Sequence, residues 1–385
     1  MTPFVFNTTK SILFRSGAAK EIHVHAGALL GGTILLVTDP GLRKLGLVDP
    51  AIAALKSAGH EVTIFDAVEA DPSVSTLNAA VDAGRAAGAS GVLGFGGGSS
   101  LDVAKVAALL LGSGEPLDEA WGVNNARGPR LPLVLVPTTA GTGSEVTPVA
   151  ILTVSGDEKR GVSSPLILPD IALLDAELTL GLPPAITAAT GVDAMVHAIE
   201  AYASANANNN PLSRMLAREA LRLLGANIET VVSNGGNVEA REAMLLGSML
   251  AGQAFANSPV AAVHALAYPV GGIFHIPHGL SNALVLTAVL RFNLPAAASI
   301  YAEIAADAFP HLADIPQDAR GEAFIEALQL LIARLGMPPR LRDVNIPQEA
   351  LPRMAADAMK QQRLLVNNPR PVTQADALAI YQEAW

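Results

Sequence analysis

Asp193 and His197 have the spacing of two side chains that share one face of a helix. They lie four positions apart in GVDAMVHAIEAY (191–202), so on a helix they would sit one turn apart on the same side. The residues beside them are mostly apolar, and a buried carboxylate or imidazole needs a partner. A divalent cation would satisfy both side chains. A hydrogen bond between the two would also do so, and the spacing alone leaves both interpretations open.

Two further histidines would complete a metal site. His264 lies in the helical pattern PVAAVHALAY, and His278 follows 14 positions later, after a Gly-Gly break. One carboxylate and three imidazoles suit a borderline transition metal such as Fe²⁺ or Zn²⁺, with one position left open for a substrate. This interpretation requires His197 and His264, which are 67 positions apart, to meet in the fold. The alternative is that these histidines are structural.

Two loops of small residues each follow an apolar run that is typical of a strand. The first is Gly96-Gly97-Gly98-Ser99-Ser100, and the second is PTTAGTGSE (137–145). Glycines let a backbone approach a phosphate closely, and a helix N-terminus offers free N–H groups. An ordinary strand-to-helix turn is the alternative for each loop. Two such loops favour a ligand site, because ligands bind at the carboxyl ends of parallel strands.

Asp39 ends the first apolar run. A carboxylate in that place can accept a hydrogen bond from an adenosine ribose and disfavour a 2′-phosphate. In the usual dinucleotide fingerprint the glycine loop precedes the acid, whereas here Asp39 lies 57 positions before Gly96. Taken alone, Asp39 is better explained as the cap of a helix that starts at Pro40.

The elements that must position these residues differ between the two halves of the chain. Apolar runs at 33–39, 61–68, 91–96 and 131–137 alternate with helical patterns at 41–58, 73–87 and 101–111. Such alternation predicts a parallel sheet with helices on both faces. Beyond residue 182 the strand-like runs stop. We therefore expect a Rossmann-like α/β dinucleotide-binding domain at 1–182 and an all-α domain at 183–385.

Composition excludes several classes of protein. The 385 residues are 50% hydrophobic and 16% charged, which predicts two folded domains and not a disordered chain. The net charge of −10, without a long Lys/Arg run, argues against a nucleic-acid partner. The chain has no cysteine, so disulfides and thiolate metal sites are excluded. No signal-peptide pattern or membrane-spanning stretch is visible, so we expect a cytoplasmic protein with no membrane partner.

Four long motifs resemble the iron-containing (group III) alcohol dehydrogenase family. They are GGGSSLDVAK (96–105), PTTAGTGSEVTPVA (137–150), GVDAMVHAIEAY and the segment VHALAYPVGGIFHIPHGLSNALVL that starts at Val263. The resemblance spans nearly the whole chain. It implies an N-terminal dinucleotide-binding domain, a C-terminal helical domain and an active site in the cleft between them. It also implies a homodimer.

The resemblance assigns roles to particular residues. It implies metal ligands at Asp193, His197, His264 and His278, of which His264 and His278 also count as catalytic. It implies a pyrophosphate loop at Gly96, Gly97, Gly98 and Ser99, with Asp102 near it. It implies a second cofactor loop at Thr138, Thr139 and Thr142, with Lys159 and Leu180 near the nicotinamide. Asp39 falls on the ribose position, which implies NAD and not NADP, and Phe255 falls on a wall of the substrate pocket.

Tyr268 departs from the family pattern. Many members have a second histidine four residues after the third ligand, where this chain has Tyr268. Tyr268 would relay a proton, bind a polar group of the substrate, or form an aromatic wall whose hydroxyl bonds a carbonyl. A tyrosine here is similar to the hydroxyacid–oxoacid transhydrogenase branch. The related maleylacetate reductases lack the full Asp-His-His-His set, so the intact set argues against that activity.

We therefore expect a metal-dependent, NAD(H)-linked alcohol dehydrogenase. The metal would polarise the alcohol oxygen, and hydride would pass between the carbinol carbon and the nicotinamide. The pocket has few charged candidates, which favours a small neutral alcohol or aldehyde. A hydroxy-acid dehydrogenase or transhydrogenase, a maleylacetate-reductase-like enzyme, a metal-dependent lyase of the same fold and a non-catalytic binding protein are the alternatives.

Overall fold

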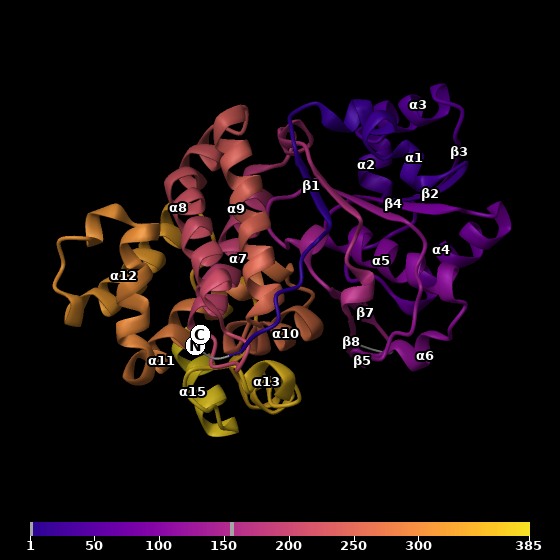
Figure 1. Ribbon diagram of the computed structural model, residues 1–385. Coiled ribbons are helices and arrows are strands. Elements are labelled where there is room, and N and C mark those ends of the chain that lie inside the picture. Colours follow the sequence, from indigo (N-terminus) through magenta and orange to yellow (C-terminus); the bar gives the residue numbers. More distant parts are fainter. Residues whose placement is uncertain (1–2, 155–157) are drawn as a thin grey trace. The chain divides into compact units, whose positions relative to one another are not determined.

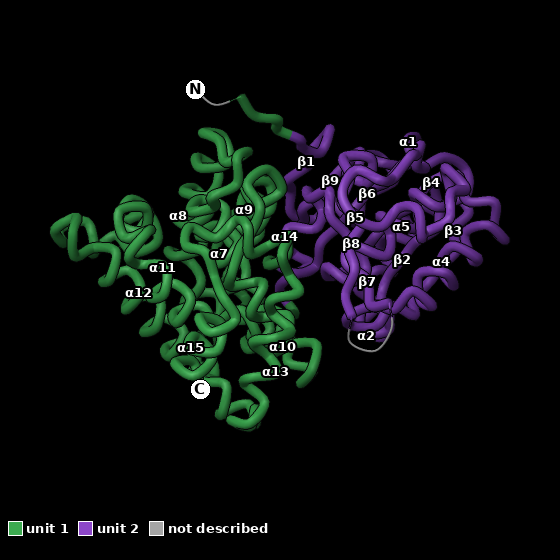
Figure 2. The backbone as a smooth tube through the Cα atoms, turned by 90° about the horizontal axis from the view of Figure 1, so that it is seen from below, with its two compact units in different colours: residues 1–6, 140–142, 181–385 green, residues 7–139, 143–180 purple. Residues whose placement is uncertain are grey.

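The computed structural model describes residues 3–154 and 158–385 (Figure 1), and the chain folds into two compact units (Figure 2). The sheet unit comprises Asn7–Thr139 and Gly143–Leu180. The helical unit comprises Gly181–Trp385, the start of the chain up to Phe6, and Ala140–Thr142. The main change of unit thus lies two residues before the predicted boundary, and two short segments belong to the other unit.

The sheet unit contains six parallel strands in the order β1-β9-β6-β4-β2-β3. The parallel sheet predicted from the apolar runs is therefore confirmed. The strands are β1 (Ser11–Phe14), β2 (Thr33–Val37), β3 (Glu61–Phe65), β4 (Gly91–Gly96), β6 (Leu133–Pro137) and β9 (Ile171–Leu174). The four predicted runs are β2, β3, β4 and β6, whereas β1 and β9 were not anticipated.

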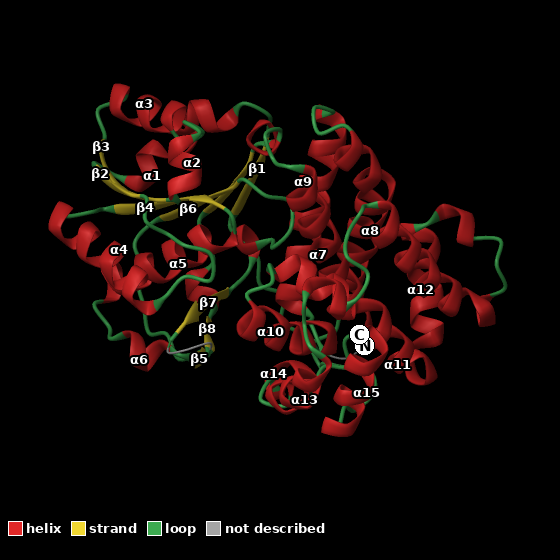
Figure 3. Ribbon diagram, turned by 180° about the vertical axis from the view of Figure 1, so that it is seen from behind, coloured by secondary structure: helices red, strands yellow, loops and turns green. Residues whose placement is uncertain are grey.

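Helices cover both faces of this sheet (Figure 3). Leu35 and Val37 pack with α4 and α5, while Ile34 and Leu36 point the other way, toward α1 and α3. Because both faces are buried, the central strands are apolar along their whole length. The helices of this unit are α1 (Ala28–Leu30), α2 (Pro40–Lys44), α3 (Asp49–Ser57), α4 (Val74–Ala87), α5 (Gly98–Ser113) and α6 (Leu117–Ala120).

Two features of the sheet unit differ from the expectation. The helix predicted at 41–58 is two helices, because Gly46 adopts a left-handed φ of +67° and ends the first one. The unit also contains a second sheet of three strands, in the order β5 (Gly122–Val123), β8 (Lys159–Ser163) and β7 (Val149–Thr153). Its β7 and β8 are antiparallel.

The helical unit has no strand in residues 183–385, all of which the structure describes, so the predicted all-α character is confirmed. Its helices are α7 (Pro184–Ala203), α8 (Pro211–Ser233), α9 (Val238–Asn257), α10 (Ala262–Phe274), α11 (His278–Ala308), α12 (Gln317–Arg334), α13 (Leu351–Ala358), α14 (Gln362–Leu365) and α15 (Gln374–Ala384). Helix α7 packs against α8, α9 and α11. It is therefore buried almost all round.

Glycines let α11 approach two neighbouring helices at the level of the backbone. A Cβ atom on Gly279 would lie 2.3 Å from the carbonyl oxygen of Ala189 in α7. A Cβ atom on Gly225 of α8 would lie 2.1 Å from the carbonyl oxygen of Ala308, at the other end of α11. Neither approach leaves room for a side chain. The first of them holds His278, the residue next to Gly279, against α7.

Helix α11 is long and apolar enough to cross a membrane, by length and composition alone. Half of its most apolar window is buried inside the protein, and the helix packs against α7, α8, α10, α12 and α15. A core helix passes the same test, so the length and composition are weak evidence for a membrane span.

Candidate metal centre

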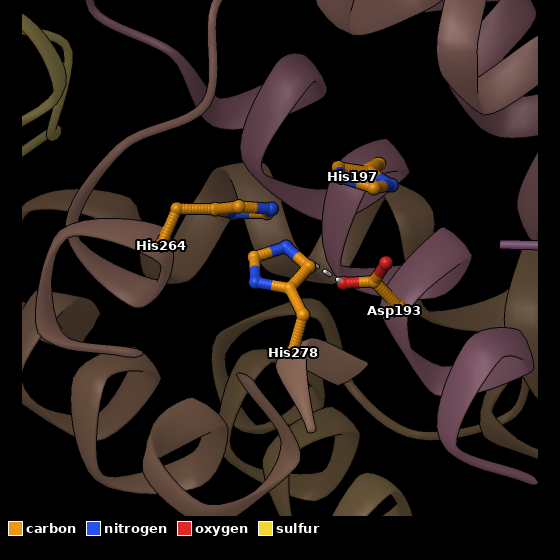
Figure 4. A group of neighbouring side chains, drawn as sticks. All are labelled: Asp193, His197, His264 and His278. Atoms are coloured by element: carbon orange, nitrogen blue, oxygen red, sulfur yellow. Dashed lines mark ion pairs between the residues drawn. The ribbon is translucent and has the colours of Figure 1, made fainter. Parts of the chain in front are cut away.

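Four side chains of the helical unit converge on one point (Figure 4). Asp193 and His197 come from α7, His264 from the first turn of α10, and His278 is the first residue of α11. Each offers one ligand atom, and these atoms all lie within 4.8 Å of one another. The structure therefore brings together the two groups that the sequence places 67 positions apart.

The turn between α10 and α11 places the last two ligands side by side. His275 adopts a left-handed conformation, with a φ of 55°, and ends α10. Pro277 then precedes the first turn of α11. As a result the rings of His264 and His278 lie 5.4 Å apart, centroid to centroid.

Burial and mutual charge set the protonation of the cluster. Asp193, His197 and His264 are at most 4% exposed, whereas the side chain of His278 is 37% exposed. Burial lowers the pKa of His197 to about 3, so its imidazole is neutral at pH 7. Burial alone would raise the pKa of Asp193, but the three imidazoles and the Asn282 amide hold it below its usual value. The cluster thus presents a carboxylate and neutral His197, both suited to a cation.

Two hydrogen bonds orient the buried imidazoles. His264 Nδ1 lies 2.6 Å from Oε2 of Glu200, whose Oε1 accepts from the backbone N–H of Val263 at 2.7 Å. His197 Nδ1 lies 3.2 Å from the carbonyl oxygen of Gly141. An imidazole that donates from Nδ1 keeps its Nε2 lone pair for a metal. Glu200 was not predicted from the sequence, although an acid in the apolar run of α7 is a usable signal.

Asn282 also touches the ligands. It lies one turn after His278, and its Nδ2 is 2.6 Å from Asp193 Oδ1 and 3.3 Å from His278 Nε2. Its buried Oδ1 has no hydrogen-bond partner among the described residues, as expected where a further polar group belongs. Asn282 was not predicted from the sequence either.

The donor set fits Fe²⁺ or Zn²⁺. One oxygen and three nitrogens without a thiolate match the ligands that these ions accept. Ligands bonded at about 2.1 Å to one ion lie no more than about 4.2 Å apart. The observed limit of 4.8 Å is slightly longer, so a bound ion would draw the four ligand atoms closer together.

Two aromatic rings line the ligand set. Phe255, from α9, stacks on His197 with ring centroids 4.4 Å apart, so this predicted pocket residue lies at the site. The ring of Tyr268 lies 6.4 Å from that of His278. The Tyr268 hydroxyl accepts a hydrogen bond from Arg363 Nη2 at 3.0 Å. Its partner is thus a guanidinium and not the carbonyl that the wall interpretation assumed.

The two predicted cofactor loops lie next to each other, although Ala140–Thr142 of the second loop is grouped with the helical unit. Gly96 ends β4 with a φ of +156°, and Gly97 precedes the first turn of α5, which holds Gly98 and Ser99. The Thr138 N–H donates to the Gly96 carbonyl at 3.0 Å. A Cβ atom on Gly97 would lie 3.8 Å from Thr139. The loops thus meet at the carboxyl ends of two neighbouring strands, where ligands bind in such sheets.

Asp102 ties the second loop to α5. Its Oδ1 accepts from the Ser144 hydroxyl at 2.6 Å, and its Oδ2 accepts from the Ile151 N–H at 2.9 Å. Lys105, which the sequence analysis missed, is fully buried and donates to Ser144 Oγ at 2.7 Å and to the Val149 carbonyl at 2.8 Å. Asp102 therefore has protein donors on both oxygens. Its predicted place near the pyrophosphate stays a prediction.

The remaining predicted cofactor residues are less closely grouped. Asp39 caps α2, because its Oδ1 accepts from the Leu42 N–H at 3.0 Å, which leaves Oδ2 without a hydrogen bond in the described chain. Lys159 forms an ion pair with Asp71. Leu180 is the last residue of the sheet unit, and Thr142 belongs to the segment grouped with the helical unit. Their roles in cofactor binding stay predictions.

Models of one protein family match both units. The model described as "Iron-containing alcohol dehydrogenase" matches residues 9–176, and "Fe-containing alcohol dehydrogenase family, C-terminal" matches residues 187–385. The chain belongs to the iron-containing alcohol dehydrogenase family. This membership agrees with the donor set at Asp193, His197, His264 and His278. The chain is an alcohol dehydrogenase.

Relatives of this alcohol dehydrogenase match it over nearly their whole length. Long-chain-alcohol dehydrogenase 1 of Geobacillus thermodenitrificans is 40% identical, over 96% of this chain and 93% of the relative. Sulfoacetaldehyde reductase of Bilophila wadsworthia is 37% identical, over 98% of each. NAD-dependent methanol dehydrogenase of Bacillus methanolicus is 33% identical, over 100% of each. A crystal structure of 1,3-propanediol oxidoreductase superposes with a TM-score of 0.95, at 35% identity over 100% of both chains.

Proposed function

We propose that this alcohol dehydrogenase uses NAD(H) and one Fe²⁺ or Zn²⁺ ion to interconvert a small alcohol and its aldehyde or ketone. The observation that carries the proposal is the convergence of four ligand atoms within 4.8 Å. NAD(H) is supported by the two adjoining loops of the sheet unit and by the name of the methanol dehydrogenase relative. A bound metal supplies Lewis acidity toward the alcohol oxygen.

The residues around the four ligands have distinct roles. Glu200 holds His264 in one tautomer, through the 2.6 Å bond to its Nδ1. Phe255 walls the pocket at His197. Tyr268 accepts its hydrogen bond from Arg363 and keeps its own hydrogen to donate, so it is placed to pass a proton. If it does, Tyr268→Phe lowers kcat by about 10²-fold, the scale of general acid–base catalysis.

A direct assay tests the proposal. The purified enzyme is stripped with a chelator, reloaded with Fe²⁺ or Zn²⁺, and followed by absorbance of the reduced nicotinamide across a panel of alcohols and aldehydes. We expect turnover only with metal, and none from His278→Ala, whose metal content falls while its fold persists. His311→Ala changes an exposed histidine that is not one of the four ligands, and it is the matched control. Full metal content in His278→Ala would overturn the four-ligand assignment.

The names of the relatives span methanol, long-chain alcohols and a sulfonated aldehyde. A hydroxy-acid dehydrogenase or transhydrogenase is the second candidate, and the arginine beside Tyr268 favours it. Transhydrogenation requires the cofactor to stay bound. It is detected as oxo-acid reduction that proceeds without release of free NADH. The intact ligand set speaks against a maleylacetate-reductase-like activity.

Assembly and location are part of the proposal. We propose a homodimer, supported by the family resemblance and by an apolar content of 50%. Light scattering on the purified enzyme would show twice the chain mass of 39.6 kDa.

We propose a cytoplasmic location. The absence of cysteine from the chain is compatible with it. Fractionation of the source cells tests it.

A further inference from the structure

We infer that Arg363 and Tyr268 form a recognition position for an anionic group beside the metal centre, so that the preferred substrate is a short alcohol or aldehyde bearing a carboxylate or sulfonate. This inference rests on the proposed function, because it concerns the substrate of that same site. It differs from the expectation of a neutral substrate. That expectation missed Arg363, which lies 95 positions after Tyr268.

Arg363 and Tyr268 lie next to the ligands through an unbroken series of contacts. Arg363 belongs to the short helix α14, which packs on α10, the helix that carries His264 and Tyr268. Its Nη2 donates to the Tyr268 hydroxyl at 3.0 Å, and its guanidinium carbon lies 5.8 Å from the centre of that ring. The same ring lies 6.4 Å from the ring of His278. One aromatic ring thus separates the guanidinium from a metal ligand.

The charge of Arg363 is not balanced by a carboxylate of the described residues. No acidic side chain of the described chain lies within 4.0 Å of its guanidinium. Its neighbours in sequence behave differently, since Arg353 and Lys360 both pair with Asp357. A guanidinium has five N–H donors, and the described chain uses one of them, for Tyr268. The remaining donors suit an oxyanion, which arginine binds through two parallel hydrogen bonds.

Exposure shows the side from which a substrate reaches the ligands. Asp193, His197 and His264 are buried, whereas His278 is 37% exposed. A molecule whose oxygen approaches the ligand set therefore passes His278, and Tyr268 lies beside that ring. Arg363 is itself exposed, so its donors are open to a molecule in solution. An anionic group on the far end of a short substrate meets the guanidinium there.

Matched substrate pairs test the inference. The holoenzyme is assayed with 3-hydroxypropionate against 1-propanol for a carboxylate, and with 2-hydroxyethanesulfonate against ethanol for a sulfonate. The readout is the ratio of kcat/KM for the anionic alcohol to that for its neutral counterpart. We expect this ratio to exceed one for at least one pair. It should fall by about 10- to 100-fold in Arg363→Gln, the scale of a lost charge-assisted pair.

Two further variants sharpen the result. Arg363→Lys keeps the positive charge but lacks the two parallel N–H donors of the guanidinium. Its ratio should therefore lie between those of Arg363→Gln and the wild type. Arg353→Gln removes an exposed arginine from the neighbouring helix α13 and should leave the ratio as in the wild type. Titration calorimetry on the NAD-bound enzyme compares the affinity for propionate with the affinity for propionamide. This readout is independent of turnover. Propionate should bind more weakly to Arg363→Gln.

The outcomes separate this inference from the proposed function. Turnover of neutral alcohols without preference for either anionic partner, or an equal ratio in Arg363→Gln, overturns the anion position and leaves the dehydrogenase intact. Failure to oxidise any alcohol with metal and nicotinamide overturns both. A preference confined to one pair identifies whether the anion is a carboxylate or a sulfonate.

Discussion

Glu200 shows how one side chain outside the ligand set tunes it. Its carboxylate accepts a hydrogen bond from the Val263 N–H and lies 2.6 Å from His264 Nδ1. The backbone thus fixes the carboxylate, and the carboxylate fixes the imidazole. A buried acid in that place makes the imidazole more basic as a ligand and fixes the ring. Glu200 is thus a positioning residue, which acts on the metal through His264.

Glu200→Gln should weaken metal binding by about 10- to 100-fold, because an amide is a poorer partner for the imidazole N–H. Competition with a chromophoric chelator measures the Zn²⁺ dissociation constant without any assay of turnover. Glu229→Gln, on an exposed glutamate of α8, serves as the control. Equal dissociation constants in the wild type and Glu200→Gln would reduce this carboxylate to a structural role.

Asp39 can be tested for cofactor choice without losing the helix cap. Asp39→Ser keeps an oxygen that accepts from the Leu42 N–H but removes the charge. If the carboxylate binds the ribose, the gap between NAD and NADP should narrow by about 1–3 kcal/mol. The kcat/KM values for the two cofactors give this gap. A constant ratio, together with an unchanged melting temperature, would leave Asp39 as a cap alone.

At the scale of elements, the backbone contact between α11 and α7 sets the position of His278. Gly279→Ala would place a methyl carbon only 2.3 Å from the carbonyl oxygen of Ala189, which is too close for either atom to stay in place. The first turn of α11 must then move away from Asp193. We expect lower stability, by about 1–3 kcal/mol, and weaker metal binding.

Gly225→Ala is the matched comparison, because its Cβ would meet the carbonyl oxygen of Ala308 at the far end of the same helix. That variant should lose stability while metal affinity is kept. Urea unfolding and metal titration separate the two effects. Equal metal affinity in both variants would show that the α7–α11 contact does not position the ligand.

Asp170 joins three strands of the sheet and gives it a defined dependence on pH. It accepts hydrogen bonds from Arg130 at 2.6 Å, from Lys10 at 2.6 Å and from the Leu133 N–H at 3.0 Å. Burial raises the pKa of Asp170, but these bonds outweigh burial and bring it to about 2, below its usual value of 3.8. Its contribution to stability is therefore present above pH 3.8 and lost as the pH falls through 2.

Asp170→Asn should lower the free energy of unfolding at pH 7 by about 1–2 kcal/mol. The wild type and the variant should converge as the pH approaches 2, where the wild-type carboxyl is protonated. Urea unfolding at a series of pH values between 2 and 7 measures both. A difference that stays constant down to pH 2 would attribute the effect to packing and not to charge.

The elements that the sequence predicted are those with a continuous signal. Strands β2, β3, β4 and β6 are apolar runs because helices bury both of their faces. Strands β1 and β9 have four residues each, too few for a pattern to show. The split of the predicted 41–58 helix depends on the backbone angle of Gly46, and composition alone does not distinguish that glycine from others.

The site was predictable to the extent that its residues share an element. Asp193 and His197 follow from their spacing on α7, and His264 and His278 were the candidates to complete the set, a role that the family resemblance also assigns to them. Arg363 could not be predicted, because it meets Tyr268 only through the packing of α14 on α10. Single-sequence patterns carry no information on a contact between residues 95 positions apart.

At the scale of the whole molecule, the metal ligands and the paired glycine and threonine loops belong to different units. Asp193, His197, His264 and His278 all lie in the helical unit, and Gly96–Ser99 with Thr138 and Thr139 lie in the sheet unit. Most contacts that organise each set lie within its own unit, and the direct link is His197 Nδ1, which lies 3.2 Å from the carbonyl oxygen of Gly141 in the second loop. Removal of the metal should therefore leave nicotinamide binding largely in place.

We expect the chelator-treated enzyme to bind NADH with a dissociation constant within about fivefold of the metal-loaded value, or about 1 kcal/mol, while turnover is lost. Fluorescence of the bound dihydronicotinamide measures the binding. Readdition of Zn²⁺ should restore turnover and provides the control for irreversible damage. Loss of NADH binding on chelation would mean that the metal organises the cofactor loops.

The partial exposure of His278 also bears on how the enzyme is supplied with its ion. Three ligands are enclosed, so an ion that leaves or enters must exchange through the fourth, which is the one that water reaches. A nitrogen-and-oxygen site of this kind binds Zn²⁺ more tightly than Fe²⁺. The ion found after purification thus reflects the metal supply of the culture and the buffers. Growth in iron-rich medium, with handling free of oxygen and zinc, is the way to obtain a uniformly ferrous preparation.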